Sequence, residues 1–187
     1  VTNPEDMEKE DSILVIWGGS DISPTLYGHT PSKHSGAEIG LSRRDEIEWN
    51  LAKEAVKRGI PIIGVCRGAQ MMCAMAGGYL IQDVKGHGMS HTILTREGEE
   101  YLSSSLHHQL MYPWDVEYEM IAISKEKISH GWYIVEGEKN LEEIDEEPEI
   151  VYFPTVKSLA IQGHPEFHQR TSPYSHYCLN LIEEYLD

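Results

Sequence analysis

Short continuous apolar runs alternate with segments of helical spacing in the first half of the chain. Ser12–Trp17 and Ile60–Val65 are near-continuous apolar runs, which are typical of strands buried on both faces of a parallel sheet. Asp45–Lys57 and Ala69–Ala76 have the apolar spacing of helices. The order strand, helix, strand, helix predicts an α/β fold with a doubly wound, mostly parallel open sheet flanked by helices.

The second half of the chain has shorter β-like segments. We expect strands at Tyr79–Ile81, His91–Leu94, Met120–Ile123, Trp132–Val135, Glu149–Phe153 and Ser158–Gln162. A closing amphipathic helix is predicted over Tyr174–Leu186. The acidic segment Glu136–Glu149 is interpreted as a solvated loop, with an acidic docking surface as the alternative. No internal repeat or linker divides the sequence, so we expect residues 1–187 to form a single domain.

The formal net charge of −16 narrows the choice of partners. Such a charge repels phosphate backbones and anionic lipids, so we expect a small-molecule substrate rather than nucleic acid or a membrane. No apolar run approaches the ~18 residues of a membrane span, and Val1–Asp11 lacks the pattern of a signal peptide. Three cysteines, an odd number, argue against a disulfide framework and favour a reducing compartment. We therefore expect a cytoplasmic location.

The segment Gly64-Val65-Cys66-Arg67-Gly68 places a cysteine where a buried strand passes into a helix. It is the cysteine form of the G-x-S-x-G nucleophile elbow. Glycines flank the turn because side chains there would collide with the approaching backbone, and the helix N-terminus favours a thiolate. Cys66 is therefore a candidate nucleophile, with an inert core thiol as the alternative. Cys73 and Cys178 are interpreted as core residues.

A second motif, Gln162-Gly163-His164-Pro165-Glu166, supplies a candidate base and an orienting group. Glu166 lies two residues after His164, where an extended backbone puts both side chains on one face. The intervening proline favours that conformation. Cys66, His164 and Glu166 therefore form a candidate catalytic triad.

Other histidines raise the alternative of a zinc site, and they are His87, His91, His107 and His108. Their spacing contains neither an H-E-x-x-H pattern nor a C-x-x-C pair. We therefore expect no metal ion, and nothing in the sequence indicates another cofactor.

Several short motifs occur along the chain from about residue 12 onward. They are Gly18–Pro24, Leu26–Gly28, Arg44-Asp45 with Glu48, Gly64–Gln70, Gly77–Asp83, Ser105–Gln109 and Gln162–Glu166. This set resembles the class I glutamine amidotransferases, and within that superfamily it is most similar to the gamma-glutamyl hydrolase branch. The resemblance implies a flavodoxin-like α/β fold with a nucleophile elbow.

The resemblance also implies a reaction. Cys66 would attack the side-chain carbonyl of glutamine or of a gamma-glutamyl compound, and His164 would protonate the departing amine. Water would then release glutamate from the gamma-glutamyl thioester. The backbone N–H groups of the oxyanion hole would come from Gly18, Gly19 and Arg67. The residues that bind the amino-acid end of the substrate would be Gln70, His107, His108 and Gln109.

Two enzymatic functions share this chemistry. A glutamine amidotransferase-type hydrolase would release ammonia to a separate acceptor synthase as its partner, since the sequence contains no phosphate-binding P-loop. A free-standing gamma-glutamyl hydrolase would instead release another amine. A catalytically silent scaffold on the same fold is the third alternative, and the joint presence of Cys66, His164 and Glu166 argues against it.

Some positions depart from the family pattern. Val1–Asp11 stands where the family usually has a further strand, and Trp17 stands where proline often precedes the paired glycines. Gly163 stands where an aromatic residue commonly precedes the histidine. We expect a changed sheet edge, a changed oxyanion turn, and an enlarged or loosened pocket wall at Gly163.

Overall fold

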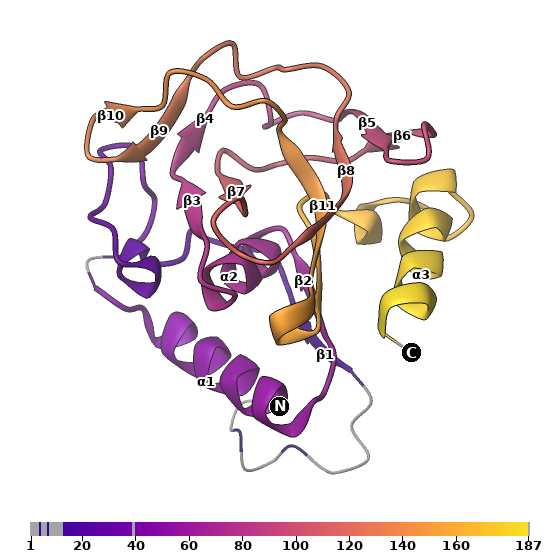
Figure 1. Ribbon diagram of the computed structural model, residues 1–187, viewed down its shortest axis with the longest axis horizontal. Coiled ribbons are helices and arrows are strands. Elements are labelled where there is room, and N and C mark those ends of the chain that lie inside the picture. The colour runs from indigo at the N-terminus through magenta and orange to yellow at the C-terminus, as the bar shows by residue number, and fades with distance from the viewer. Residues whose placement is uncertain (1–3, 5–6, 8–12, 39, 187) are drawn as a thin grey trace.

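The computed structural model describes residues 4, 7, 13–38 and 40–186 (Figure 1). The main sheet has the strand order β1-β2-β12-β11-β8-β5-β6. Its strands are β1 (Leu14–Ile16), β2 (Ile62–Val65), β5 (His91–Thr95), β6 (Glu100–Ser103), β8 (Glu119–Ser124), β11 (Pro148–Phe153) and β12 (Ser158–Ile161). Two smaller sheets in this part of the chain contain β3 (Tyr79–Ile81), β4 (Asp83–Val84), β7 (Leu110–Tyr112), β9 (Tyr133–Glu136) and β10 (Lys139–Asn140).

Parallel pairing is concentrated in one part of the main sheet. β2 pairs in parallel with both β1 and β12, so these strands direct their carboxyl ends to the same edge. From β12 outward, β11, β8, β5 and β6 pair in antiparallel fashion. The turn Pro154–Val156 between β11 and β12 is too short for the crossover that a parallel pair requires. The parallel strands are therefore β1, β2 and β12, and their carboxyl ends lie near Cys66.

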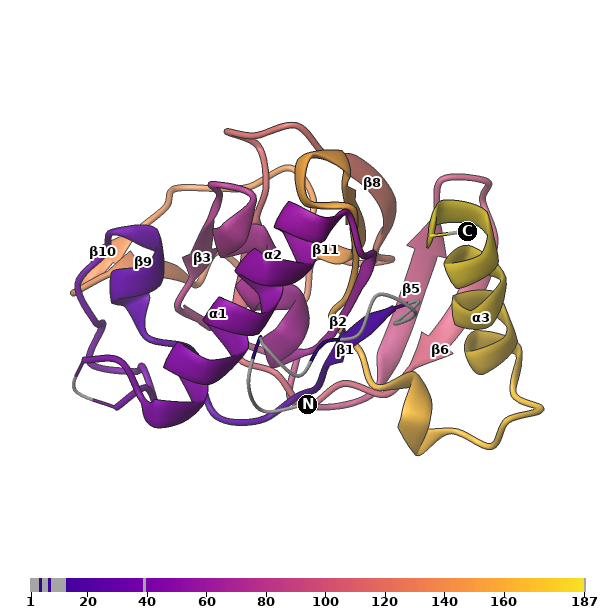
Figure 2. The same cartoon turned by 90° about the horizontal axis from the view of Figure 1, so that it is seen from below.

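Helices cover both faces of this parallel part. α1 (Arg43–Arg58) and α2 (Arg67–Met75) lie on one side, and α3 (Pro173–Leu186) lies on the other (Figure 2). Successive side chains of β2 point to opposite faces. Ile62 packs in the cluster that contains residues of α1 and α2, whereas Ile63 packs in the cluster that contains residues of α3. The continuous apolar run predicted a strand buried on both faces, and the structure confirms it.

Helix α1 includes the predicted segment Asp45–Lys57 and extends beyond it at both ends. The Ser42 hydroxyl accepts the Asp45 N–H at 3.0 Å, and the Asp45 carboxylate accepts the Ser42 N–H at 3.1 Å. This capping box satisfies two backbone donors that would otherwise lack partners. Gly59 ends the helix with a φ of 72°, a left-handed conformation that suits glycine.

The acidic segment Glu136–Glu149 differs from the solvated loop that its charge predicts. β10 lies within it and pairs with β9. Glu147 and Glu149 are each only 1% exposed and lie beside His87. Composition could not reveal this burial, because His87 lies 60 positions before Glu147. Part of this acidic segment is therefore buried in the protein core.

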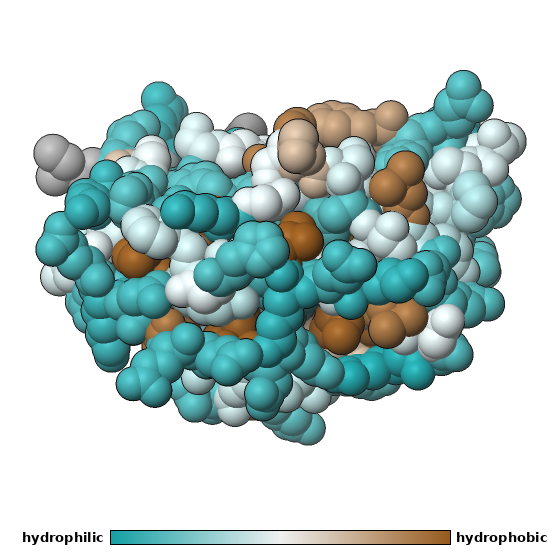
Figure 3. Space-filling view, turned by 90° about the horizontal axis from the view of Figure 1, so that it is seen from above, coloured by the Kyte–Doolittle hydropathy of each residue, from teal (hydrophilic) through white to brown (hydrophobic). Residues whose placement is uncertain are grey.

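One face of the molecule is mostly polar. The face shown in Figure 3 is mostly hydrophilic, with apolar side chains in separate patches. Among the described residues, no helix has the length and hydropathy needed to cross a membrane. Apart from residues 4 and 7, the segment Val1–Asp11 lies outside the described residues, and so does the expectation of a changed sheet edge there.

Gly68 provides a test of the packing between α2 and β1. A Cβ atom at this position would lie 2.0 Å from the carbonyl oxygen of Ile16. We expect Gly68→Ala to lower the free energy of unfolding by about 1–3 kcal/mol, because the helix must move away from the strand. Urea denaturation measures the change. Gly88→Ala, where a Cβ atom meets open space, should change the free energy by about 1 kcal/mol at most; equal losses in both variants would contradict the close packing.

Candidate active site

Cys66 joins β2 to α2 in a backbone conformation that is rare for a residue with a side chain. Its φ is 52° and its ψ is −108°. The Cys66 N–H donates to the Ile161 carbonyl at 2.8 Å, and the Cys66 carbonyl accepts the Gln70 N–H at 3.1 Å. Strain of this kind costs about 1–3 kcal/mol and persists only where the surroundings enforce it. The side chain is 7% exposed at the carboxyl edge of the parallel strands.

The two flanking glycines make this turn possible. A Cβ atom on Gly64 would lie 2.5 Å from the carbonyl carbon and oxygen of Gly68. A Cβ atom on Gly68 would collide with the β1 backbone, as described above. Both positions therefore lack room for any side chain. The steric reason for the Gly-x-Cys-x-Gly spacing that the sequence suggested is thus confirmed.

His164 follows β12 and lies against Cys66. Its Nδ1 atom is 2.8 Å from Glu166 Oε1. Hydrogen bonding with the Cys66 side chain, and then with Glu166, raises the pKa of His164 to about 9. The structure therefore brings together the three residues of the predicted triad. Their backbone differs from the expected extended form, because Pro165–Phe167 is a short 3-10 turn, in which proline suits the first position.

The backbone and ring of His164 are held from two sides. Its N–H donates to the Ser104 carbonyl at 2.9 Å, and the Ser104 hydroxyl donates to the His164 carbonyl at 2.7 Å. Phe167 stacks on the imidazole with ring centroids 4.4 Å apart and an interplanar angle of 4°. These contacts fix the ring orientation beside Cys66.

The wall behind His164 is closed at Gly163. A Cβ atom there would lie 2.1 Å from Ser103 Oγ and 2.5 Å from the Tyr174 hydroxyl. The enlarged or loosened wall expected from the missing aromatic residue is therefore wrong, because Ser103 and Tyr174 already fill that space.

Gly18 and Arg67, two of the residues predicted for the oxyanion hole, lie next to Cys66. A Cβ atom on Gly18 would lie 2.8 Å from His164 Cε1 and 3.4 Å from Cys66 Cβ, so Gly18 packs against both. Gly19 follows it with a φ of 154°. Arg67 is the first residue of α2, where backbone N–H groups have no partner within the helix.

The side chain of Arg67 anchors this region from within. It is 2% exposed and donates to Asp45 Oδ1 at 2.6 Å and also to Glu48. Glu48 accepts a second hydrogen bond from Arg44 at 2.8 Å, and Arg44 donates to the Trp17 carbonyl at 3.0 Å. The network joins the segment before the paired glycines, α1 and the start of α2. A buried arginine between two carboxylates satisfies the rule that buried charges are paired.

Sequence reasoning assigned no role to this network. Arg44, Asp45 and Glu48 were only part of the family resemblance, although the four-residue spacing of Arg44 and Glu48 is a recognisable helix-surface pair. The Trp17 side chain is 51% exposed, and its contact with the network is made by its carbonyl.

The residues predicted to bind the amino-acid end form a second polar group. Gln70 is buried, and its amide nitrogen lies 3.4 Å from the Gln109 carbonyl. Gln109 donates to Asp21 Oδ2 at 3.0 Å, and His108 Nε2 lies 3.2 Å from Asp21 Oδ1. The hydrogen bond to Asp21 is the main cause that raises the pKa of His108 to about 9. Asp21 is thus a central residue that sequence reasoning missed, although it lies within the segment Gly18–Pro24.

His107 has a different environment from its neighbours. It is 3% exposed, with Nδ1 lying 2.9 Å from the Gln109 carbonyl and Nε2 lying 3.8 Å from Glu149 Oε1. Its ring therefore supports the backbone of Gln109 and faces a buried carboxylate. The two remaining cysteines, Cys73 and Cys178, are core residues as predicted, and burial raises the pKa of each thiol to about 12.

The sequence model of peptidase C26 matches residues 6–166 of the chain. The chain belongs to the peptidase C26 family. Protein NtpR of Enterococcus hirae is 31% identical over 82% of this chain and 66% of its own length. The glutamine amidotransferase-like protein YvdE of Lactococcus lactis subsp. lactis is 33% identical over 52% of this chain and 50% of its own. The chain spans 24% to 66% of the length of such curated relatives.

A solved structure shows the same fold. A glutamine amidotransferase from Thermotoga maritima superposes with a TM-score of 0.53 at 17% identity, covering 98% of this chain and 69% of that protein. This structure confirms the predicted flavodoxin-like α/β fold, and the family match and the curated relatives support the resemblance to class I glutamine amidotransferases.

The raised pKa of His164 predicts a pH dependence. Its folded value of about 9 exceeds the ordinary 6.5, so the stabilisation from protonated His164 is complete below about pH 6.5 and is lost as the pH rises through about 9. NMR titration of the ring should show a pKa near 9. Cys66→Ala and Glu166→Gln should each lower it, with the larger drop in Cys66→Ala. Glu183→Gln, at an exposed position of α3, should not change it; an ordinary pKa in the parent protein would contradict the geometry.

The buried pair of Arg67 and Asp45 predicts a large stability effect. Asp45→Asn leaves the guanidinium without one of its two carboxylates, so the free energy of unfolding should fall by about 3–5 kcal/mol. Glu46→Gln removes an exposed carboxylate from the same turn of α1 and should change it by about 0.5 kcal/mol at most. Thermal and urea denaturation compare the two variants, and similar small losses would show that the pair contributes little.

Proposed function

We propose that the protein is a glutamine amidotransferase-type hydrolase that cleaves the side-chain amide of glutamine through a gamma-glutamyl thioester on Cys66. The observation that carries the proposal is the contact of Cys66, on its positive-φ turn, with His164, whose Nδ1 is 2.8 Å from Glu166. An imidazole in contact with a thiol can act as the general base that activates it as a nucleophile. Membership of the peptidase C26 family supports amide hydrolysis as the reaction class.

The reaction divides into acylation and hydrolysis. In the first step the Cys66 thiolate attacks the side-chain carbonyl carbon, and the C–N bond breaks as His164 gives its proton to the leaving ammonia. In the second step His164 takes a proton from water, which attacks the thioester and releases glutamate and the thiolate. Glu166 holds the imidazole orientation in both steps. Glutamine and water thus yield glutamate and ammonia.

The oxyanion of each tetrahedral intermediate would be bound by backbone N–H groups. Arg67 and the Gly18-Gly19 turn lie at the same edge of the sheet as Cys66, which this role requires. Such donors typically contribute ~10²–10³ in rate. The buried network of the Arg67 side chain would keep these donors in place without a change during the reaction.

The amino-acid end of the substrate would be bound by His108 and Gln109, which contact Asp21, and by Gln70, which contacts the Gln109 carbonyl. A carboxylate and convergent amides suit the ammonium and carboxylate groups of a zwitterion. His107 would act indirectly, by holding the Gln109 carbonyl. The ammonia would pass to a separate acceptor enzyme.

A free-standing gamma-glutamyl hydrolase is the second candidate. The family match to a peptidase favours it, because a peptidase releases an amine rather than ammonia. The chemistry at Cys66 is the same, and only the leaving group differs.

Product release separates the candidates. Glutamate formation would be measured with glutamine and with a panel of gamma-glutamyl amides, each with and without candidate acceptor enzymes. Glutamine turnover favours the first candidate, and turnover of gamma-glutamyl amides alone favours the second. Cys66→Ala should lower either activity by ~10³-fold or more, whereas Cys178→Ala removes a buried thiol outside the triad and should retain it. If no substrate is turned over, the result would favour the third alternative, a catalytically silent scaffold on the same fold.

A further inference from the structure

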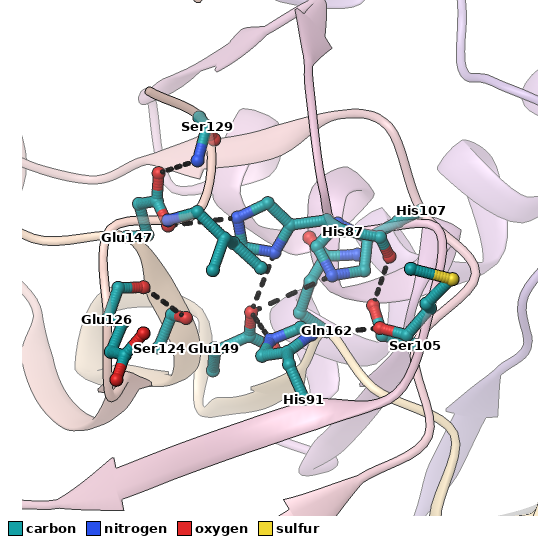
Figure 4. Close-up of polar contacts among 12 residues, drawn as sticks. His87, His91, Ser105, His107, Ser124, Glu126, Ser129, Glu147, Glu149 and Gln162 are labelled. Atoms are coloured by element: carbon teal, nitrogen blue, oxygen red, sulfur yellow. Dashed lines mark hydrogen bonds and ion pairs between the residues drawn. The ribbon is translucent and has the colours of Figure 1, made fainter. Parts of the chain in front are cut away.

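Three histidines converge on one buried carboxylate outside the triad. Glu149 Oε1 lies 2.7 Å from His91 Nε2, 3.1 Å from His87 Nδ1 and 3.8 Å from His107 Nε2. His87, His107 and Glu149 are buried, and the His91 side chain is 10% exposed. Figure 4 shows the three rings pointing toward Glu149 from separate segments of the chain.

The outer nitrogen of each ring already has a partner. His91 Nδ1 lies 3.1 Å from the Met89 carbonyl, and His107 Nδ1 lies 2.9 Å from the Gln109 carbonyl. His87 Nε2 lies 3.1 Å from the Glu147 carboxylate. Carbonyl and carboxylate oxygens only accept hydrogen bonds, so the outer nitrogens carry the hydrogens. A neutral imidazole therefore presents a lone pair on its inner nitrogen.

The inner nitrogens face an atom that also only accepts. Lone pairs of three neutral rings would point at the Glu149 carboxylate without a hydrogen between them. Among the described residues, His87 Nδ1, His107 Nε2 and Glu149 Oε2 have no hydrogen-bond partner. A divalent cation between three neutral rings and two carboxylates gives a neutral cluster.

We propose that His87, His91, His107 and Glu149 bind one divalent transition-metal ion, with zinc as the preferred ion. Three imidazole nitrogens and a carboxylate are a donor set that zinc favours. The donor atoms of His87, His91 and Glu149 lie within 4.8 Å of one another. In a tetrahedral site with ligands at ~2.1 Å, donor atoms are roughly 3.4 Å apart, so modest side-chain adjustment suffices. Hydrogen bonds from the outer nitrogens to carbonyls and a carboxylate are the usual support of ligating histidines.

The ion would have a structural role. Four protein ligands fill a tetrahedral zinc site and leave no position for substrate. The Glu149 carbonyl accepts the Gln162 N–H at 2.8 Å, two residues before His164, and His107 supports Gln109. The metal would therefore fix two segments that border the candidate active site. His91 also lines a surface pocket of about 220 Å³.

Sequence spacing alone argued against this site. The histidines do not form a compact zinc motif, and Glu149 belongs to the acidic segment interpreted as a solvated loop. Only the pairing of β11 with β8, and of β8 with β5, brings Glu149 beside His91. The proposal therefore replaces the expectation that the protein binds no metal.

Metal titration of the full chain tests the proposal. The purified protein is treated with a chelator, dialysed, and titrated with Co²⁺ and then with Zn²⁺. We expect one Co²⁺ per chain with the visible absorption of tetrahedral cobalt, displacement of that signal by Zn²⁺, and a higher Tm with Zn²⁺ than without it.

Matched variants locate the ion. His91→Gln should weaken Zn²⁺ binding by ~100-fold or more, and Glu147→Gln, which loses the support of His87, by ~10–100-fold. His176→Gln, at an exposed position of α3, should bind Zn²⁺ as the parent protein does. Circular dichroism checks that each variant is folded. Lack of stoichiometric binding by the parent protein would overturn the proposal, and so would equal weakening in His91→Gln and His176→Gln.

Discussion

The turn at Cys66 is the constraint on which the rest of the candidate site depends. Cys66 adopts a φ of 52° at the point where strand β2 passes directly into helix α2. Gly64 and Gly68 permit the helix to approach both strands so closely that a single added carbon would collide with main-chain atoms. Close packing of α2 on β1 and β2 thus holds the strained residue in place, and with it the position of the thiol beside His164.

Two buried ionic groups support this arrangement from different directions. On one side, Arg67 pairs with Asp45 and Glu48 and joins the first turn of α2 to α1. On the other side, Glu149 contacts the histidine cluster from β11. β11 pairs with β12, and His164 follows β12. Each group is costly to bury unless its charges are matched. Their shared effect is to fix the segments that carry the triad, rather than to touch a substrate.

The sequence predicted those features whose causes are local. The helix predicted at Asp45–Lys57 was recognisable from its apolar spacing, and the strand predicted at Ile60–Val65 from its continuous apolar run; the structure has them at Arg43–Arg58 and Ile62–Val65. The strand Glu100–Ser103 was missed because its mixed residues form a strand only by pairing with β5. The burial of Glu149 was missed for a similar reason, since its partners are distant in the chain. The triad was predictable because its motifs are compact, whereas the Arg67 network and the role of Asp21 required the fold.

The central claim is that the Cys66 sulfur forms a covalent bond with the carbonyl carbon of a gamma-glutamyl group. The most direct measurement is mass spectrometry of protein mixed with glutamine or a gamma-glutamyl amide and quenched in acid, followed by peptide mapping. The account predicts a mass increase of one glutamyl group on the peptide that contains Cys66. An adduct on another residue, or turnover without any adduct on rapid quenching, would contradict it.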